Sequence, residues 1–415
     1  MRPEVAQAMD AVHDEVLGNP TGSHPPAQRA RRLLEEARDE VAAFLGRSPG
    51  DVVFTSGGTE SANLAVLGPL YAARAAYKAQ TGDAVDAAQA GDAVDAAPVR
   101  MPRGEADPGP GAGGDIRPVV LYSAVEHPAV SEACRAAARD GVVAHELPVD
   151  TAGRLDVGAL ADLLAGRGDS ASGRVALVAV MTANNETGVI QPVTDVVDVV
   201  RRLAPQAVVF TDAVQAASYC DLGVVAAGVD LVSLSAHKLG GPAGVGALAI
   251  GERVTLMPRQ HGGGQERDRR SGTQNVAGAV GLAAAVRLVC HERNATARAT
   301  AARRDRLATG LLAAIPQARR TVPPEVAVLP GHLHLCMEGM AREELLVALG
   351  AVGVCVSGGS SCASGALEPS HVLAAMGVPE AWSGGALRFS LGPQTSDEDI
   401  DRALALVPEA VASLR

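Results

Sequence analysis

Apolar residues in the first 250 positions gather in short runs rich in valine, separated by segments with helical spacing. The runs are continuous and do not alternate apolar with polar residues, which is typical of strands buried on both faces of a mostly parallel sheet. Residues 26–46 show the helical pattern, because Leu34, Ala37, Val41 and Leu45 recur at helical spacing. The sequence therefore predicts an α/β domain with a mostly parallel, mixed sheet between helices. The predicted strands are residues 51–56, 118–123, 175–181, 207–212, 231–235 and 244–250.

The pattern changes after about residue 290, where a long helix rich in arginine and alanine is predicted at about 292–315. We therefore place a large domain at residues 1–292 and a smaller α+β C-terminal domain at 293–415, and the chain length suits two domains. Residues 80–116 differ from both, because "GDAVDAAQA" is nearly repeated by "GDAVDAAPV" in a stretch rich in glycine and proline. Low-complexity sequence of this kind predicts a disordered surface insertion.

The composition narrows the class of protein. Apolar residues make up 47% of the chain and charged residues 20%, as in soluble globular proteins. The net charge of −11 argues against direct binding of nucleic acid. No apolar run is long enough for a transmembrane helix, and the N-terminal "MRPEVAQAMDAVHDEV" lacks the apolar core of a signal peptide. We expect a cytoplasmic protein without a membrane partner.

Six cysteines are scattered along the chain without a C-x-x-C pair. In a long chain without a signal peptide, they are expected to be reduced thiols. Their spacing matches no zinc site, so no metal site is predicted. Cys355 lies in the apolar run "GVCVS" and is interpreted as a core residue, whereas Cys362 lies in "SGGSSCASG", which is typical of a loop. The other four are Cys134, Cys220, Cys290 and Cys336.

Polar side chains follow the predicted strands where those strands end. Ligands of open α/β sheets bind beyond the carboxyl ends of the strands, so these side chains are expected to share one edge. Each has an ordinary alternative, such as a helix cap at Thr59 or a structural histidine at His127. The set comprises Gly58, Thr59, His127, Asn185, Asp212, Gln215, Ser235, His237 and Lys238.

Lys238 is one of only two lysines in a chain whose other strongly basic residues are all arginine. A lysine amine can form a Schiff base, whereas a guanidinium stays charged and cannot. The other lysine, Lys78, lies at the edge of the low-complexity insertion and is interpreted as a solvated side chain. Pyridoxal 5'-phosphate (PLP) needs a lysine, an aspartate for its pyridinium nitrogen, and hydroxyl and N–H groups for its phosphate. The predicted sheet edge offers all of these groups.

Eight segments of the chain resemble the cysteine desulfurases, which belong to class V of the fold type I PLP enzymes. The resemblance extends from about residue 3 to residue 413 and is interrupted at 74–116. Its most specific segments are "SLSAHKLGGPAGVGAL" and "HGGGQERDRRSGT" in combination. The others are "FTSGGTES", "EHPAV", "NNETGVIQP", "TDAVQ", "GGSSCASGALEPSHVL" and "LRFSLG".

The resemblance implies a role for each matching residue around PLP. Lys238 would form the Schiff base, His127 would stack on the ring and act as acid or base, and Asp212 would pair with the pyridinium nitrogen. Hydrogen bonds around the ring hydroxyl would come from Asn185 and Gln215. The phosphate would be held by Gly58, Thr59, Ser235 and His237.

Three further residues complete the implied site. Thr273 in "RRSGT" would reach the phosphate of a neighbouring subunit, so a homodimer is expected. Arg388 in "LRFSLG" would bind the substrate carboxylate with two hydrogen bonds, with Asn19 of "GNPTGSH" nearby. The alternatives are that Arg388 forms a surface ion pair and that Asn19 is a turn residue.

The resemblance also implies the reaction and the partners. L-Cysteine would be the substrate, and the Cys362 thiolate, in a loop of the SSGSAC type, would attack its sulfur. The products would be L-alanine and a persulfide on Cys362. Its sulfur would pass to an acceptor such as an iron–sulfur scaffold protein or a tRNA-thiolation relay, and the sequence does not choose between them.

The chain departs from the family pattern in two places. It begins at "RPEV" without the usual preceding segment of the "YLDNAATTP" type, and residues 74–116 are inserted. We expect the first departure to affect activity and not the fold, and the second to loop out. The alternative functions are another class V activity, such as a selenocysteine lyase, transaminase or epimerase, and a non-catalytic assembly protein of the same fold. A loop cysteine favours the desulfurase, because the other activities do not require one.

Overall fold

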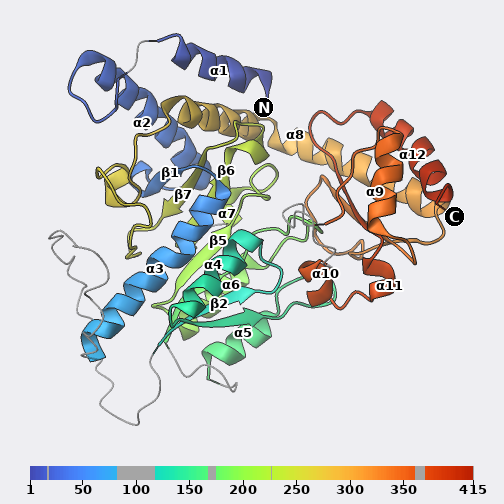
Figure 1. The fold of residues 1–415 in the computed structure, drawn as a ribbon, viewed down its shortest axis with the longest axis horizontal. Coiled ribbons are helices and arrows are strands. Elements are labelled where there is room, and N and C mark those ends of the chain that lie inside the picture. Colours follow the sequence, from blue (N-terminus) through green and yellow to red (C-terminus); the bar gives the residue numbers. More distant parts are fainter. Residues whose placement is uncertain (16–17, 82–116, 167–173, 226, 360–369, 415) are drawn as a thin grey trace.

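The computed structural model describes residues 1–15, 18–81, 117–166, 174–225, 227–359 and 370–414, which form two sheets with their helices (Figure 1). All six predicted strands are confirmed. They are β1 (Val52–Thr55), β2 (Pro118–Ser123), β4 (Arg174–Ala179), β5 (Val208–Asp212), β6 (Leu231–Ser235) and β7 (Gly246–Ile250). A further strand, β3 (Val143–Leu147), escaped prediction because its polar, half-buried sequence resembles a loop.

The large sheet has the strand order β1-β7-β6-β5-β4-β2-β3. Only β7 is antiparallel to its neighbours, so the carboxyl ends of the other strands meet at one edge. Alternate residues of each strand enter two cores; in β1, Val52 and Phe54 face one core and Val53 the other. The expected mixed, mostly parallel sheet between helices is therefore confirmed. One face packs on α2 (Pro25–Leu45), α5 (Val157–Leu164), α6 (Val193–Leu203) and α8 (Val276–Ala314), and the other on α3 (Gly58–Thr81) and α4 (Pro128–Arg139).

Helix α8 is longer than predicted, since it begins at Val276 and continues for 39 residues. Its first half packs against α1 (Pro3–His13) and α2, and its second half against the small sheet and α12 (Asp397–Ala412). The helix therefore presents different faces to two cores, which blurs the apolar periodicity that would reveal its start. It crosses residue 292 without interruption.

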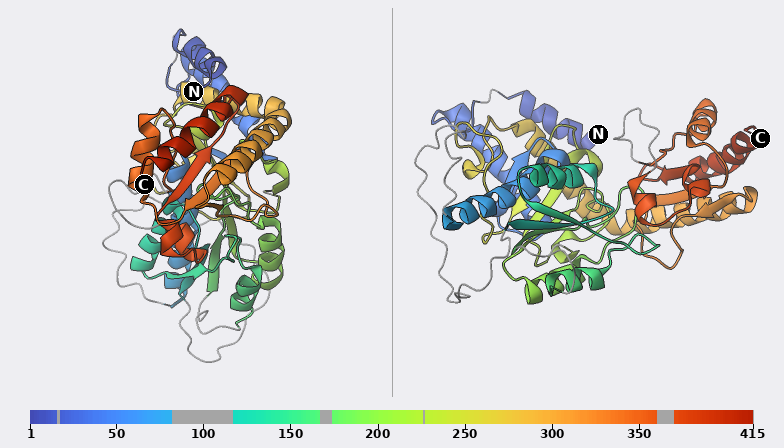
Figure 2. Two further views of the ribbon diagram at one scale, coloured as in Figure 1. Left: turned by 90° about the vertical axis from the view of Figure 1, so that its right-hand side faces the viewer. Right: turned by 60° about the horizontal axis from the view of Figure 1, so that its bottom comes forward.

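The small sheet is antiparallel, with the order β10-β9-β8, and lies beside one end of the large sheet (Figure 2). It comprises β8 (Ala318–Arg320), β9 (His332–Met337) and β10 (Ala386–Ser390). The shorter helices are α7 (Leu222–Val225), α9 (Arg342–Ala351), α10 (His371–Ala375) and α11 (Glu380–Ser383), with single turns η1 (Pro49–Asp51), η3 (Ala236–Leu239) and η4 (Glu266–Asp268).

Two predicted features lie outside the described residues. They are Cys362 and all but the first residues of the predicted insertion at 80–116. The interpretation of Cys355 as a core residue was wrong, because its side chain is exposed beyond the end of α9. None of the helices in the described ranges is long and apolar enough to cross a membrane.

Candidate active site

Asp212, the last residue of β5, is buried at the carboxyl edge of the large sheet, with 8% of its surface exposed. Its Oδ1 accepts hydrogen bonds from Val214 N and Ser233 Oγ, both at 2.9 Å. No hydrogen bond from the described residues reaches Oδ2. Burial raises the pKa of Asp212, because the charged form loses its water, and the nearby His127 and Lys238 only partly oppose this rise. Oδ2 is therefore suited to pair with a proton or cation on a ligand.

His127 caps the start of α4 beside Asp212. Its Nδ1 accepts a hydrogen bond from Ala129 N at 3.1 Å, so the proton of the neutral ring sits on Nε2. Burial lowers the pKa of His127, Asp212 opposes this effect, and the charge of Lys238 adds to it. The ring is thus uncharged near neutral pH and can exchange a proton at Nε2.

Lys238 lies in η3, directly after β6, with its side chain exposed. Ser218 Oγ donates to the Lys238 carbonyl at 2.8 Å, which fixes the backbone of this turn. The positive charge of Lys238 lowers the pKa values of His127, Asp212 and His332. A cavity of about 910 Å³ is lined by Lys238 together with Gln215, His332 and the segment after β10.

The turn between β1 and α3 lies against the end of β6. A Cβ on Gly58 would come within 2.8 Å of a Val214 methyl and 3.5 Å of Ser235 Cβ, so a side chain there would displace its neighbours. Ser235 Oγ hydrogen-bonds His237 Nδ1 at 2.8 Å. Thr59 is exposed in the first turn of α3. The predicted phosphate ligands therefore gather at the N-terminus of a 24-residue helix, which favours an anion.

Arg388 reaches the large domain from β10 of the small sheet. Its Nη1 donates to Asn185 O at 2.7 Å and its Nε to Ser390 Oγ at 3.0 Å. Within the described ranges it forms no ion pair, so nothing there supports the alternative of a surface ion pair. Burial lowers its pKa, and the charge of Glu186 opposes this effect. Gln215 lies nearby, with its Nε2 3.1 Å from Nε2 of His332.

Asn19 and Thr273 are not brought to this site. Asn19 Oδ1 accepts hydrogen bonds from Thr21 N and Oγ1, as in a turn. Helix α2, which begins at Pro25, lies on the side of the molecule away from the small sheet (Figure 1). Thr273 is exposed before α8. The role predicted for Thr273 needs a second copy of the chain.

Three buried polar residues around the site were missed. Glu126 Oε1 accepts from Met181 N at 2.6 Å, and burial raises its pKa well above the usual range, which favours the protonated form. Glu186 Oε2 accepts from Ser370 Oγ at 2.6 Å. Burial lowers the pKa of His332 to about 3, which keeps this ring neutral. Glu126 and Glu186 directly follow or precede predicted site residues, so adjacency was the available signal.

These groups fit PLP. A carboxylate oxygen without a hydrogen bond from the described residues suits the pyridinium nitrogen, an exposed amine suits the aldehyde carbon, and the crowded glycine turn suits the phosphate. No group of three or more His, Cys, Asp and Glu side chains in the described ranges could hold a metal ion.

Comparisons with known proteins point in the same direction. The aminotransferase class-V family matches residues 1–95 and 116–403. The chain is 38% identical to a cysteine desulfurase of Sinorhizobium fredii, over 99% of this chain and 94% of the relative. It is 37% identical to an IscS-like cysteine desulfurase of Mycobacterium tuberculosis, over 100% and 94%. A solved NifS-like protein superposes with a TM-score of 0.81 at 31% identity, covering 100% of this chain and 96% of that one.

Proposed function

This chain belongs to the cysteine desulfurases of the aminotransferase class-V family, and we propose that it uses PLP bound at Lys238 to convert L-cysteine to L-alanine. The single observation that carries the assignment of the site is Asp212, whose Oδ2 lacks a partner in the described structure while Lys238 and His127 lie close by. A structural aspartate at this depth would be expected to have a cationic partner of its own.

PLP, when bound, supplies an electron sink that lets bonds at the amino-acid carbon atoms break. Lys238 Nζ would hold the cofactor and then carry a proton. Asp212 Oδ2 would accept the hydrogen bond of the ring nitrogen. His127 would lie on the ring and exchange a proton at Nε2. Asn185 and Gln215 would contact the ring hydroxyl, and the phosphate would be held by Gly58, Thr59, Ser235 and His237.

Arg388 would bind the carboxylate of L-cysteine, because its half-buried guanidinium forms no ion pair within the described ranges. The thiolate of Cys362 would then take the substrate sulfur. A persulfide forms on Cys362 as the carbon–sulfur bond of L-cysteine breaks, and the carbon skeleton leaves with an added proton as L-alanine. This transfer balances without an external oxidant or reductant.

The remaining assignments are extensions of the family resemblance. The active unit would be a cytoplasmic homodimer in which Thr273 reaches the partner's phosphate and Asn19 approaches a substrate site. The domain division at residues 292 and 293 would separate the cofactor domain from the domain that carries Cys362. The persulfide would pass its sulfur to an iron–sulfur scaffold or another acceptor protein.

The test is to incubate the purified protein with PLP and L-cysteine, measure L-alanine, and map the mass of an added sulfur atom. The proposal predicts stoichiometric L-alanine and sulfur on Cys362. Cys362→Ser should keep the cofactor absorption and lose both products, because a hydroxyl is a far poorer nucleophile toward sulfur. Unchanged L-alanine release by Cys362→Ser would instead favour a lyase, and transfer of the amino group would favour a transaminase.

A further inference from the structure

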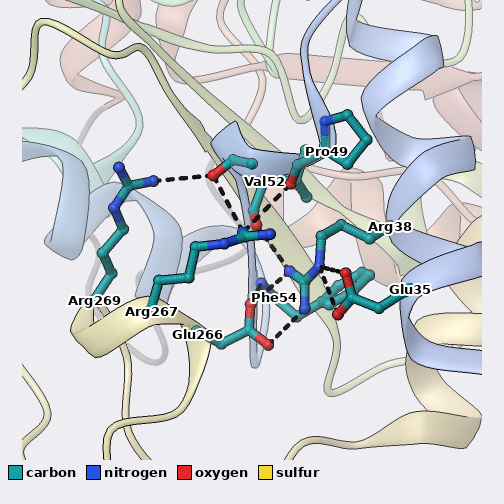
Figure 3. Close-up of polar contacts among 9 residues, drawn as sticks. Glu35, Arg38, Pro49, Val52, Phe54, Glu266, Arg267 and Arg269 are labelled. Carbon is teal, nitrogen blue, oxygen red and sulfur yellow. Dashed lines mark hydrogen bonds and ion pairs between the residues drawn. The ribbon is translucent and has the colours of Figure 1, made fainter. Parts of the chain in front are cut away.

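The segment between β7 and α8 contains a buried carboxylate that the proposed mechanism does not use. The side chain of Glu266 is 0% exposed and that of Arg38, on α2, is 3% exposed. Arg38 donates to Glu266 from both terminal nitrogens, at 2.7 and 3.0 Å (Figure 3). A two-point ion pair of this kind fixes orientation as well as distance.

This ion pair also covers the outer edge of β1. Arg38 Nη1 donates to Val52 O at 2.8 Å, and Phe54 N donates to Glu266 Oε2 at 3.0 Å. β1 is an edge strand with β7 on its other side, so these outward groups are the ones that a further strand would bind. The arginine and the glutamate replace that strand, and the guanidinium also lies 4.8 Å from the centre of the Phe54 ring.

Glu266 begins a turn whose backbone is strained. Its φ is 47°, and the next two residues, Arg267 and Asp268, have φ of 56° and 61°. Left-handed conformations are unfavourable for residues with a side chain, and here three occur in succession. Arg267 Nη1 donates to Gly50 O at 3.1 Å. Contacts of this kind must offset the free-energy cost of the left-handed backbone conformation.

The strained turn leads to the start of α3. Two residues after Asp268, Arg270 Nε donates to Glu60 Oε1 at 2.8 Å, and Glu60 Oε2 accepts from Ser56 N at 2.7 Å. Glu60 lies in the first turn of α3, where Gly58 and Thr59 are the proposed phosphate ligands. An uncompensated carboxylate there would repel a phosphate, and Arg270 neutralises it.

We propose that Arg38 and Glu266 are positioning residues for the cofactor: they hold the left-handed turn that places Arg270 on Glu60 and so prepares the phosphate-binding turn. The inference rests on the proposed PLP site. It differs from a purely structural role, in which the ion pair would only shield the edge of β1, because it couples the pair to PLP affinity through the geometry of the turn.

The first experiment titrates the apoprotein of each variant with PLP and follows visible absorption. Glu266→Gln should raise the PLP dissociation constant by about tenfold, since a buried ion pair loses one charge. Trypsin cleavage after Arg269 should accelerate in the same apoprotein. Adding Asp268→Gly should recover most of the PLP affinity, because glycine adopts the left-handed conformation without strain. Adding Asp268→Ala, the matched control, should not.

Arg270→Met tests the same route without disturbing the buried pair, and it serves if Glu266→Gln does not fold. It should also weaken PLP binding by about tenfold. Wild-type affinity in Arg270→Met or in Glu266→Gln would overturn the inference, as would equal recovery by Asp268→Ala and Asp268→Gly. A wild-type protein that binds no PLP would refute the proposed function itself, which separates the two failures.

Discussion

Asp212 and Asp230 are buried carboxylates at opposite edges of the same sheet. Asp212 ends β5, and Asp230 directly precedes β6, the neighbouring parallel strand. Their exposed fractions are similar, at 8% and 6%. Asp230 Oδ2 accepts hydrogen bonds at 2.8 Å from each of two arginines, Arg201 and Arg253, and Val209 N donates at 2.7 Å. From the described residues, Asp212 receives only a hydroxyl and a backbone N–H hydrogen bond, both on one oxygen.

The difference shows how the two edges are used. Burial alone would raise the pKa of Asp230, but the hydrogen bonds of Arg253, Val209 and Arg201 outweigh it and lower that pKa. Burial prevails at Asp212 and raises its pKa. At the amino edge the chain therefore supplies its own cations, and the buried carboxylate has a purely structural role. At the carboxyl edge the cation is left to a ligand, which is where the proposed cofactor binds.

The largest expected effect is on catalysis at the carboxyl edge. Asp212→Ala should lower kcat for L-alanine formation by about 10²–10³-fold, because an electrostatic partner placed for the cofactor is lost. Its apoprotein should unfold no more easily than the wild type. Asp230→Ala, assayed below its unfolding temperature, should retain near-normal kcat. Equal loss of activity in both variants would erase the distinction between the edges.

The next effect is on stability at the amino edge. Asp230→Ala leaves Arg201 and Arg253 without their shared carboxylate, so the free energy of unfolding should fall by about 2–3 kcal/mol. This value is below that of a fully buried pair, because both arginines are partly exposed. Urea unfolding measures the difference. A loss under about 0.5 kcal/mol, as for ordinary surface changes, would contradict a stabilising role for the ion pairs of Asp230.

The pH dependence of apoprotein stability should have opposite signs at the two residues. Because the pKa of Asp212 is raised in the folded protein, its contribution to the free energy of unfolding is complete below the unfolded-state pKa of about 3.9. This contribution is lost as pH rises through the folded-state pKa. The stability of the Asp212→Asn apoprotein should therefore increase relative to that of the wild type as pH rises. The lowered pKa of Asp230 gives stability above about pH 3.9 that is lost on acidification through the folded value.

The free energy of unfolding of Asp230→Asn should consequently be lowest relative to the wild type at neutral pH, and the difference should shrink in acid. Urea unfolding of both variants over a pH series measures the two slopes, which lie above about pH 3.9 for Asp212 and below about pH 3.9 for Asp230. Slopes of the same sign would show that the two carboxylates have similar surroundings in the folded protein. That result would contradict the difference in pKa shift between Asp212 and Asp230.

The smallest expected effect concerns Cys355, which belongs to neither edge. Its side chain is exposed, so Cys355→Ser should change the free energy of unfolding by less than about 0.5 kcal/mol and leave L-alanine formation intact. The matched comparison is Cys362→Ser, seven residues along the chain, which should stop the reaction. Loss of activity in Cys355→Ser would show that the assignment of the reactive thiol to Cys362 is wrong.

The sequence predicted the strands and the residues at their ends, because continuous valine-rich runs and the polar residues that follow them are local features. It could identify Asp212, but it could not show that no described residue hydrogen-bonds to Oδ2. It gave no sign of the ion pairs at Asp230, because Arg201 and Arg253 come from separate segments that only the fold brings together. The strained turn at Glu266 was hidden for the same reason, since Arg38 lies far away in the chain.

Two errors have local causes. Cys355 lies among valines, but those residues follow a surface helix and do not form a buried strand. The start of α8 was placed too late because the helix changes partners along its length. Composition and spacing also could not show whether Thr273 meets a site, because that requires the arrangement of two chains.

The most direct test of the account uses the scarcity of lysine in this chain. The wild-type protein is loaded with PLP, reduced with borohydride, digested, and its peptides are mapped by mass spectrometry. With only Lys78 and Lys238 available, the assignment is between two side chains. We predict the cofactor mass on the peptide that contains Lys238, with Lys78 unmodified. Modification of Lys78 alone, or of neither lysine, would contradict a cofactor site at the carboxyl edge of the sheet.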